Sequence, residues 1–342
     1  MKRRVVILLA CLLAACGNEP AEKPPFSPLS VDSEVLARTL PGYSTGSYRS
    51  EVVDGLVLEA PELANAELVL RIWYPEAFDG ESPVVIFSHG NWSDREKYDR
   101  LLSHWSSHGY TVIATTHLDG RSMARGIFNS LRYGQLGLID ARVQDIQFLL
   151  DHLSVIEAEL EESIGSALTF QKDHVVIAGH SFGAFTAQQF AGAIASDENV
   201  ISRASDDRVA GVIAISPPGP MFDAIHEKSW ENMQGPVLVT TGTWDSNPQF
   251  WPDWRAHLMS FETSQPGEQY ALVVEGADHY LGNLICRPER EAEPQTDALA
   301  MVNSASVAFL NSVLKASDDN LAQLSAGAIS DLTDGFADFR KR

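Results

Sequence analysis

Short apolar runs alternate along the chain with longer segments of helical periodicity. The short runs are rich in β-branched residues and predict strands, at 66–74, 83–87, 110–115, 174–178, 209–215, 236–241 and 270–274. Helices are predicted between them, at 94–108, around 139–153, at 182–195 and at 297–314. Strands that alternate with helices predict an α/β fold with a mostly parallel sheet covered by helices on both faces.

The amino-terminal residues follow the order of a secretory signal peptide. Basic residues at 2–4 precede an apolar run at 5–15 that is too short to span a bilayer. The run ends in Leu-Ala-Ala-Cys, which resembles the lipobox of bacterial lipoproteins. That resemblance implies cleavage before Cys16 and acylation of Cys16, and Gly17 implies the outer membrane or cell surface as the location. An ordinary signal peptide with an incidental cysteine is the alternative.

Charge and cysteine content exclude several classes of partner. The net charge is −21, and loss of the three basic residues at 2–4 would make it −24. Nucleic acid and anionic membrane surfaces are therefore poor partners, and a lipid would have to provide the anchoring. Because Cys11 leaves with the signal and Cys16 would be acylated, Cys286 is left alone and no internal disulfide is predicted.

Composition divides the chain into four parts. Residues 1–16 are the signal peptide with the lipobox cysteine. Residues 17–47, rich in Pro, Glu and Ser, predict an extended tether. Residues 48–315 form the predicted catalytic domain, and 316–342 are a tail to which the pattern gives no role.

The strongest chemical signal is Gly-His-Ser-Phe-Gly at 179–183, between a predicted strand and a predicted helix. A strand, a sharp turn and a helix are the context of a nucleophile elbow, in which the central serine is exposed on a strained turn. A Gly-rich turn without chemistry is the alternative. Ser181 is therefore the predicted nucleophile.

A serine nucleophile needs a histidine base and an acid that orients it. His279 and Asp245 follow the strands that end at 274 and 241, so the same sheet edge would carry all three groups. Asp223 is the rival acid, and Asp278 is predicted to be a solvated neighbour of the histidine. Other histidines fall in predicted helices, in loops that follow no strand, or beside the nucleophile: His104, His108, His152, His226, His257 and His180.

Two backbone N–H groups should stabilise the oxyanion that forms during acyl transfer. Phe182 directly follows the nucleophile and is the first predicted donor. The second is Asn91, which follows the His-Gly pair at 89–90 after the strand at 83–87. A plain turn at the end of that strand is the alternative for the His-Gly pair.

Three motifs together resemble a known family: Phe-Ser-His-Gly at 87–90, Gly-His-Ser-Phe-Gly at 179–183 and Gly-Ala-Asp-His at 276–279. The chain is similar to α/β-hydrolase serine esterases, in particular bacterial predicted dienelactone hydrolases, platelet-activating-factor acetylhydrolases and cutinases, over about 70–314. The resemblance implies an esterase. It departs at Ser181, where true dienelactone hydrolases have a cysteine, and at 216–218, where no adjacent carboxylate takes the position of the acetylhydrolase acid.

Aromatic residues could line a substrate pocket or could simply cap the core. They are Trp92, Trp244, Phe250, Trp251 and Trp254. Because the connection between 215 and 236 is too short for a large lid, small or medium esters are the predicted substrates. The chain shows no metal or nucleotide motif, and no cofactor is predicted.

Two other functions remain open. The same machinery could cleave amides or thioesters, or the fold could serve a non-catalytic envelope lipoprotein that binds a partner.

Overall fold

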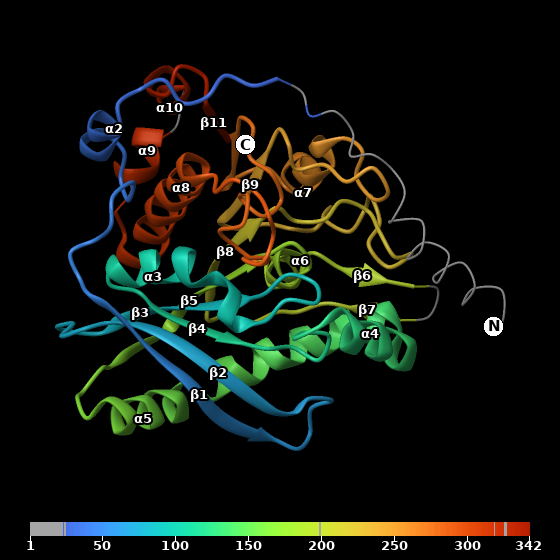
Figure 1. The fold of residues 1–342 in the computed structure, drawn as a ribbon. Coiled ribbons are helices and arrows are strands. Elements are labelled where there is room, and N and C mark those ends of the chain that lie inside the picture. The colour runs from blue at the N-terminus through green and yellow to red at the C-terminus, as the bar shows by residue number, and fades with distance from the viewer. Residues whose placement is uncertain (1–22, 24, 198–199, 318, 325–326) are drawn as a thin grey trace.

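The apolar runs form the strands of one sheet (Figure 1). The computed structural model describes Lys23 and residues 25–197, 200–317, 319–324 and 327–342. Within this part of the chain, nine strands make the central sheet, and two further short strands, β6 (Ala195–Ser196) and β7 (Ile201–Ser202), pair beside it. The α/β prediction is confirmed.

The central sheet is parallel in its middle and antiparallel at its edges. The pairs from β4 through β10 are parallel, whereas β1, β2 and β11 run antiparallel to their neighbours. From edge to edge the strands are β1 (Ser50–Ala60), β2 (Ala66–Pro75), β4 (Thr111–Thr115), β3 (Ser82–Ser88), β5 (Phe170–His180), β8 (Val209–Ile215), β9 (Val237–Gly242), β10 (Gln269–Val274) and β11 (Ala337–Lys341).

Helices cover both faces because alternate strand residues point to opposite sides. One core holds Val85 and Phe87 and the other holds Val84 and Ile86. The helices packed on the first core are α2 (Ser33–Thr39), α3 (Asp99–Ser107), α8 (Thr296–Lys315), α9 (Asp319–Leu324) and α10 (Ala328–Leu332). Those on the second are α4 (Met123–Asp151), α5 (Leu153–Ile164), α6 (Phe182–Gln189) and α7 (Met259–Thr263). Two short 3-10 helices, η1 (Arg95–Tyr98) and η2 (Trp254–Leu258), precede α3 and α7.

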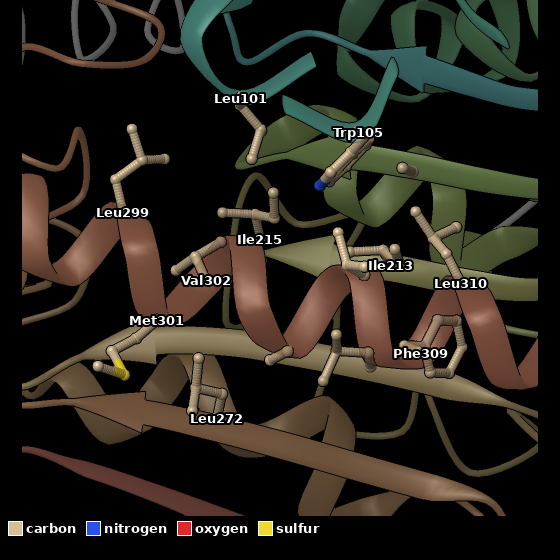
Figure 2. Packing of buried hydrophobic residues seen from close by; sticks show 14 of the residues in the cluster. Leu101, Trp105, Ile213, Ile215, Leu272, Leu299, Met301, Val302, Phe309 and Leu310 are labelled. Carbon is tan, nitrogen blue, oxygen red and sulfur yellow. The ribbon is translucent and has the colours of Figure 1, made fainter. Parts of the chain in front are cut away.

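Helix α8 lies against the middle of the sheet. Figure 2 shows its Val302 next to Ile215 and its Met301 on the side of Leu272, all of them buried. Among the described residues, α8 alone is long and apolar enough to cross a membrane, but 72% of its apolar window is buried inside the protein. Its hydrophobicity is that of a core helix.

The expected extended tether is wrong for the second half of 17–47. Asp32 caps α2 by accepting a hydrogen bond from the Glu34 N–H, and Leu36 is fully buried. Leu40 is buried as well and Tyr43 packs against the same core, so several apolar side chains hold this segment on the domain. Residues 17–22 and 24 of the segment lie outside the described residues.

The sheet also extends beyond the predicted strands. The edge strand β1 was not predicted, because Val52 and Val57 are exposed, so apolar and polar residues do not alternate, and a bulge interrupts the strand near Gly55. The tail, which the pattern left without a place, contributes α9, α10 and β11, and Phe339 of β11 is buried beside β10. The tail thus completes the sheet.

Candidate active site

Ser181 sits on a sharp turn between β5 and α6. Its backbone has φ 54°, a conformation that costs a non-glycine residue energy. The flanking glycines are required by close approach. A Cβ at Gly179 would lie 2.2 Å from the Gly183 carbonyl oxygen, and one at Gly183 would lie 2.0 Å from the Ser88 carbonyl oxygen. The turn therefore has the geometry of a nucleophile elbow.

The carboxyl ends of three strands bring Ser181, His279 and Asp245 together. The Ser181 hydroxyl lies 2.9 Å from Nε2 of His279, and Nδ1 of His279 lies 2.8 Å from Oδ1 of Asp245. The carboxylate also accepts a hydrogen bond from the Thr241 hydroxyl at 3.0 Å. Since Nδ1–H donates to the carboxylate, Nε2 is free to accept the serine proton.

A second histidine, His257, reaches the same carboxylate oxygen. Its Nε2 lies 3.0 Å from Oδ1 of Asp245, and its Nδ1 lies 2.6 Å from the Pro217 carbonyl oxygen. A carbonyl can only accept, so Nδ1 carries a proton, and the carboxylate favours a second proton on Nε2. Burial opposes a charge on His257, but Asp245 raises its pKa above the usual value. The arrangement therefore favours a charged imidazolium at His257.

Electrostatics keep the acid ionised and the base neutral. Burial alone would raise the pKa of Asp245, but His257 and His279 hold it well below the usual value. Burial lowers the pKa of His279 in spite of the neighbouring Asp245, and His180 and His257 lower it further. His279 is therefore unprotonated at neutral pH, which is the state of a general base.

A buried hydrogen-bond chain joins the three loops of the site. The Gly90 N–H donates to the Tyr98 hydroxyl at 2.8 Å, and that hydroxyl lies 3.1 Å from Nδ1 of His180. Nε2 of His180 donates to the His279 carbonyl at 2.8 Å. Nδ1 must then accept from Tyr98, and burial, which lowers the pKa of His180 to about 4, keeps the ring neutral. His180 thus belongs to this hydrogen-bond chain and makes no hydrogen bond to Ser181.

Buried hydrogen bonds fix the loop that carries Asn91. Nη1 of Arg142 donates to the His89 carbonyl at 2.6 Å, and Arg142 is fully buried in an ion pair with Asp119 at 2.7 Å. The His89 ring accepts from the His117 N–H at 3.0 Å. Among the described residues neither the Asn91 N–H nor the Phe182 N–H has a hydrogen-bond acceptor. Neither predicted donor is therefore engaged by an acceptor in the described part of the protein.

Behind this loop lies a second serine, histidine and aspartate in hydrogen-bond order. Ser88 lies 2.9 Å from Nε2 of His117, whose Nδ1 lies 2.8 Å from Asp145. These three side chains are buried. They cannot meet a substrate and serve to fix the end of β3.

Some of the predicted aromatic residues lie around the nucleophile. The Trp251 ring stacks at 6.1 Å from the His279 ring, and Phe250 contacts both Trp251 and Phe222. Phe222 in turn lies edge-on to Phe182. Phe222 was missed by the sequence analysis, and its φ of 59° is unusual for a bulky residue.

The other predicted aromatic residues pack elsewhere. Trp244 lies edge-on to Phe26 and under Lys23, at the amino-terminal segment. Trp92 packs on α4, where a Cβ at Gly126 would lie 2.0 Å from its ring. Trp254 joins the second core. The site is therefore walled by fewer aromatic residues than the sequence predicts.

The rival carboxylates have other surroundings. Asp223 is exposed and lines an open cavity of about 680 Å³ with Phe222, and His279 is not among the residues that line this cavity. Asp278 is not solvated as predicted. It is 8% exposed, accepts hydrogen bonds from Tyr280 N–H and Gly282 N–H, and pairs with Arg290. These contacts stabilise the loop that carries His279.

Asp245, His257 and His279 are also a group whose ligand atoms lie within 4.8 Å of one another, close enough for a metal ion. A metal there would replace the hydrogen bond between His279 and Asp245. The residues fit a triad without that replacement.

A family model described as alpha/beta hydrolase family matches residues 85–290, more than half of the chain. The matched range contains the elbow, both predicted oxyanion donors and the two partners of Ser181. A comparison with curated proteins gave no match.

Proposed function

The chain belongs to the alpha/beta hydrolase family, and from this premise we propose that it cleaves carboxylic esters through an acyl-enzyme on Ser181. The observation that carries the proposal is the pair of hydrogen bonds from Ser181 to His279 and from His279 to Asp245, at 2.9 and 2.8 Å. They join a strained serine to a neutral base and an ionised acid. This is the set of groups that acyl transfer by serine requires.

The proposed reaction runs in two steps. Nε2 of His279 takes the Ser181 proton as Oγ attacks the ester carbonyl, and the N–H groups of Asn91 and Phe182 stabilise the oxyanion. The imidazolium then protonates the leaving alcohol, which leaves an acyl group on Ser181. In the second step His279 takes a proton from water, the hydroxide attacks the acyl carbonyl, and Ser181 recovers its proton as the acid departs.

A fluorophosphonate probe tests the nucleophile. The chain from Gly17 onward contains every described residue and is the protein to use. The label should appear on the peptide that carries 179–183, should vanish in Ser181→Ala, and should fall strongly in His279→Ala, where the serine keeps its proton. Labelling that persists in Ser181→Ala would place the nucleophile elsewhere.

The surroundings of the site support a small or medium ester as substrate. Phe222, Phe250 and Trp251 lie in contact with one another beside the nucleophile and offer aromatic surface for an acyl or aryl group. A series of p-nitrophenyl esters of rising chain length measures the preference. Matched amides and thioesters in the same series test the rival activities. A folded chain that neither labels nor hydrolyses any of them would favour a binding lipoprotein.

We also propose, from the motifs at 87–90, 179–183 and 276–279, that the chain is similar to dienelactone hydrolases, platelet-activating-factor acetylhydrolases or cutinases.

We also propose that a lipid on Cys16 anchors the protein to the cell envelope, at the outer membrane or cell surface. Cys16 lies outside the described residues, and the proposal depends on the Leu-Ala-Ala-Cys sequence. Cys16→Ser should leave the precursor uncleaved or release the protein from the membrane fraction. Unchanged processing and fractionation in that variant would exclude the anchor.

A further inference from the structure

The first half of α4 exposes an apolar face. Met123, Phe128 and Leu131 are 54, 62 and 57% exposed, although large apolar side chains are usually buried. Helical periodicity places these three residues on one side, and the buried Gly126 and Asn129 lie on the other. We call Met123, Phe128 and Leu131 the apolar face of α4.

The inner side of this half-helix is fixed to the active-site edge of the sheet. Gly126 packs directly on Trp92, which follows Asn91. The Asn129 amide donates to the Leu118 carbonyl at 2.7 Å, in the loop that follows β4. The apolar face is therefore held outward beside the predicted oxyanion loop. In Figure 1, α4 extends at that end to a position beside β7.

Charge around the apolar face is opposite to that of the whole protein. The net charge is −21, yet residues 120–139 contain no Asp or Glu. They contain Arg121, Arg125 and Arg132, of which Arg121 and Arg132 are exposed. An apolar helix face flanked by arginine is the pattern of a helix that lies in the interface between water and lipid.

The amino-terminal segment approaches the same edge of the sheet. Lys23 lies over the Trp244 ring at 4.4 Å and 3.8 Å from Asp278, next to the triad acid and base. The chain from Cys16 to Lys23 can span at most about 25 Å. If Cys16 carries the proposed lipid, this edge of the sheet must stay within that distance of the membrane.

We propose that the apolar face of α4 binds the surface of a lipid bilayer, with Arg121 and Arg132 at anionic head groups, so that the edge carrying Ser181 faces the membrane. A second copy of the chain is a weaker candidate. Three side chains provide much less than the roughly 800 Å² per partner that a stable interface buries.

Sedimentation with vesicles of phosphatidylethanolamine and phosphatidylglycerol tests the proposal. The chain from Gly17 onward is used, so that acyl chains cannot cause binding. The double variant Phe128→Ser and Leu131→Ser should bind at least about tenfold more weakly, because two large apolar groups no longer enter the lipid. Arg132→Gln should weaken binding at low salt and leave it unchanged at high salt.

The matched control is Val155→Ser on α5, because Val155 is also exposed, at 47%, but lies outside the face. It should bind vesicles like the parent. All variants should hydrolyse a water-soluble p-nitrophenyl ester at the parental rate, because none alters the triad.

Three outcomes would overturn the inference. They are a parent that does not bind vesicles, a double variant that binds as well as the parent, and a parent that dimerises while the double variant is monomeric. The ester assay separates this inference from the proposed function, because a chain without esterase activity could still bind vesicles through α4.

Discussion

Removal of the Tyr98 hydroxyl should weaken both the fold and the site. In Tyr98→Phe, the Gly90 N–H loses its acceptor and Nδ1 of His180 loses its donor. Tyr98 is fully buried, so water cannot replace the hydroxyl without rearrangement. Each unsatisfied buried group costs about 1–3 kcal/mol, so the two groups together give a loss of about 2–6 kcal/mol. The ring remains in its contact with Phe87.

Thermal denaturation measures the first effect and ester hydrolysis the second. For a protein of this size the stability loss corresponds to a Tm that falls by about 3–8 °C. Because Gly90 precedes the proposed donor Asn91, kcat should also fall, toward the factor of about 10²–10³ that loss of a whole oxyanion donor causes.

Tyr110→Phe is the matched control. The buried Tyr110 donates to Asn311 at 2.6 Å and lies just before the amino end of β4, whereas Ser181 follows the carboxyl end of β5. This variant should lose about 1 kcal/mol and keep its kcat. If Tyr98→Phe lost no more stability than Tyr110→Phe and kept full activity, the hydrogen-bond chain would have no role in the site.

Three further changes follow from the charges of the site. Asp245→Asn should lower kcat by about 10⁴, because the base is then held in the wrong tautomer, whereas Asp223→Asn should change it little; a reversed order would move the acid to Asp223. His257→Gln removes a positive charge that lowers the pKa of His279, so the acid limb of kcat/KM, which lies below pH 6.5 in the parent, should move to higher pH. A shift to lower pH would contradict the charge on His257. The pKa of His180 is about 4 in the folded protein, against the usual 6.5. As the pH falls, His180 therefore binds a proton in the unfolded chain before it does so in the folded protein. Stability should fall between pH 6.5 and 4, by about 3 kcal/mol from this residue, and denaturation midpoints across that range measure it; a midpoint that stays constant would contradict a neutral buried His180.

Local sequence patterns predicted the middle of the fold well. Central parallel strands are buried on both faces, so they are continuous apolar runs that a pattern can identify. The elbow at Ser181 could be predicted because such a turn needs its glycines within a few residues of the serine. The positions of His279 and Asp245 followed from a topological rule, since the carboxyl ends of parallel strands share one edge.

What the sequence could not predict depends on contacts between distant segments. His257 appeared to be a loop histidine, and only the packing of η2 against Pro217 and Asp245 gives it a role. Tyr98 lies 82 residues before His180, and nothing local links them. Trp244 precedes the acid directly, yet its ring turns toward Phe26. Side-chain direction in a loop is decided by what packs on it.

The break in α4 divides one helix into two units that can open separately. Gly134 has φ 73° between the two halves, so the ladder of amide hydrogen bonds is interrupted there. The second half, with Ile146 and Leu150 buried, should exchange its amide protons only through opening of the domain. The first half, with fewer buried side chains, should exchange through a local opening of lower free energy. A protease should therefore cut before Gly134 while the rest of the molecule stays folded.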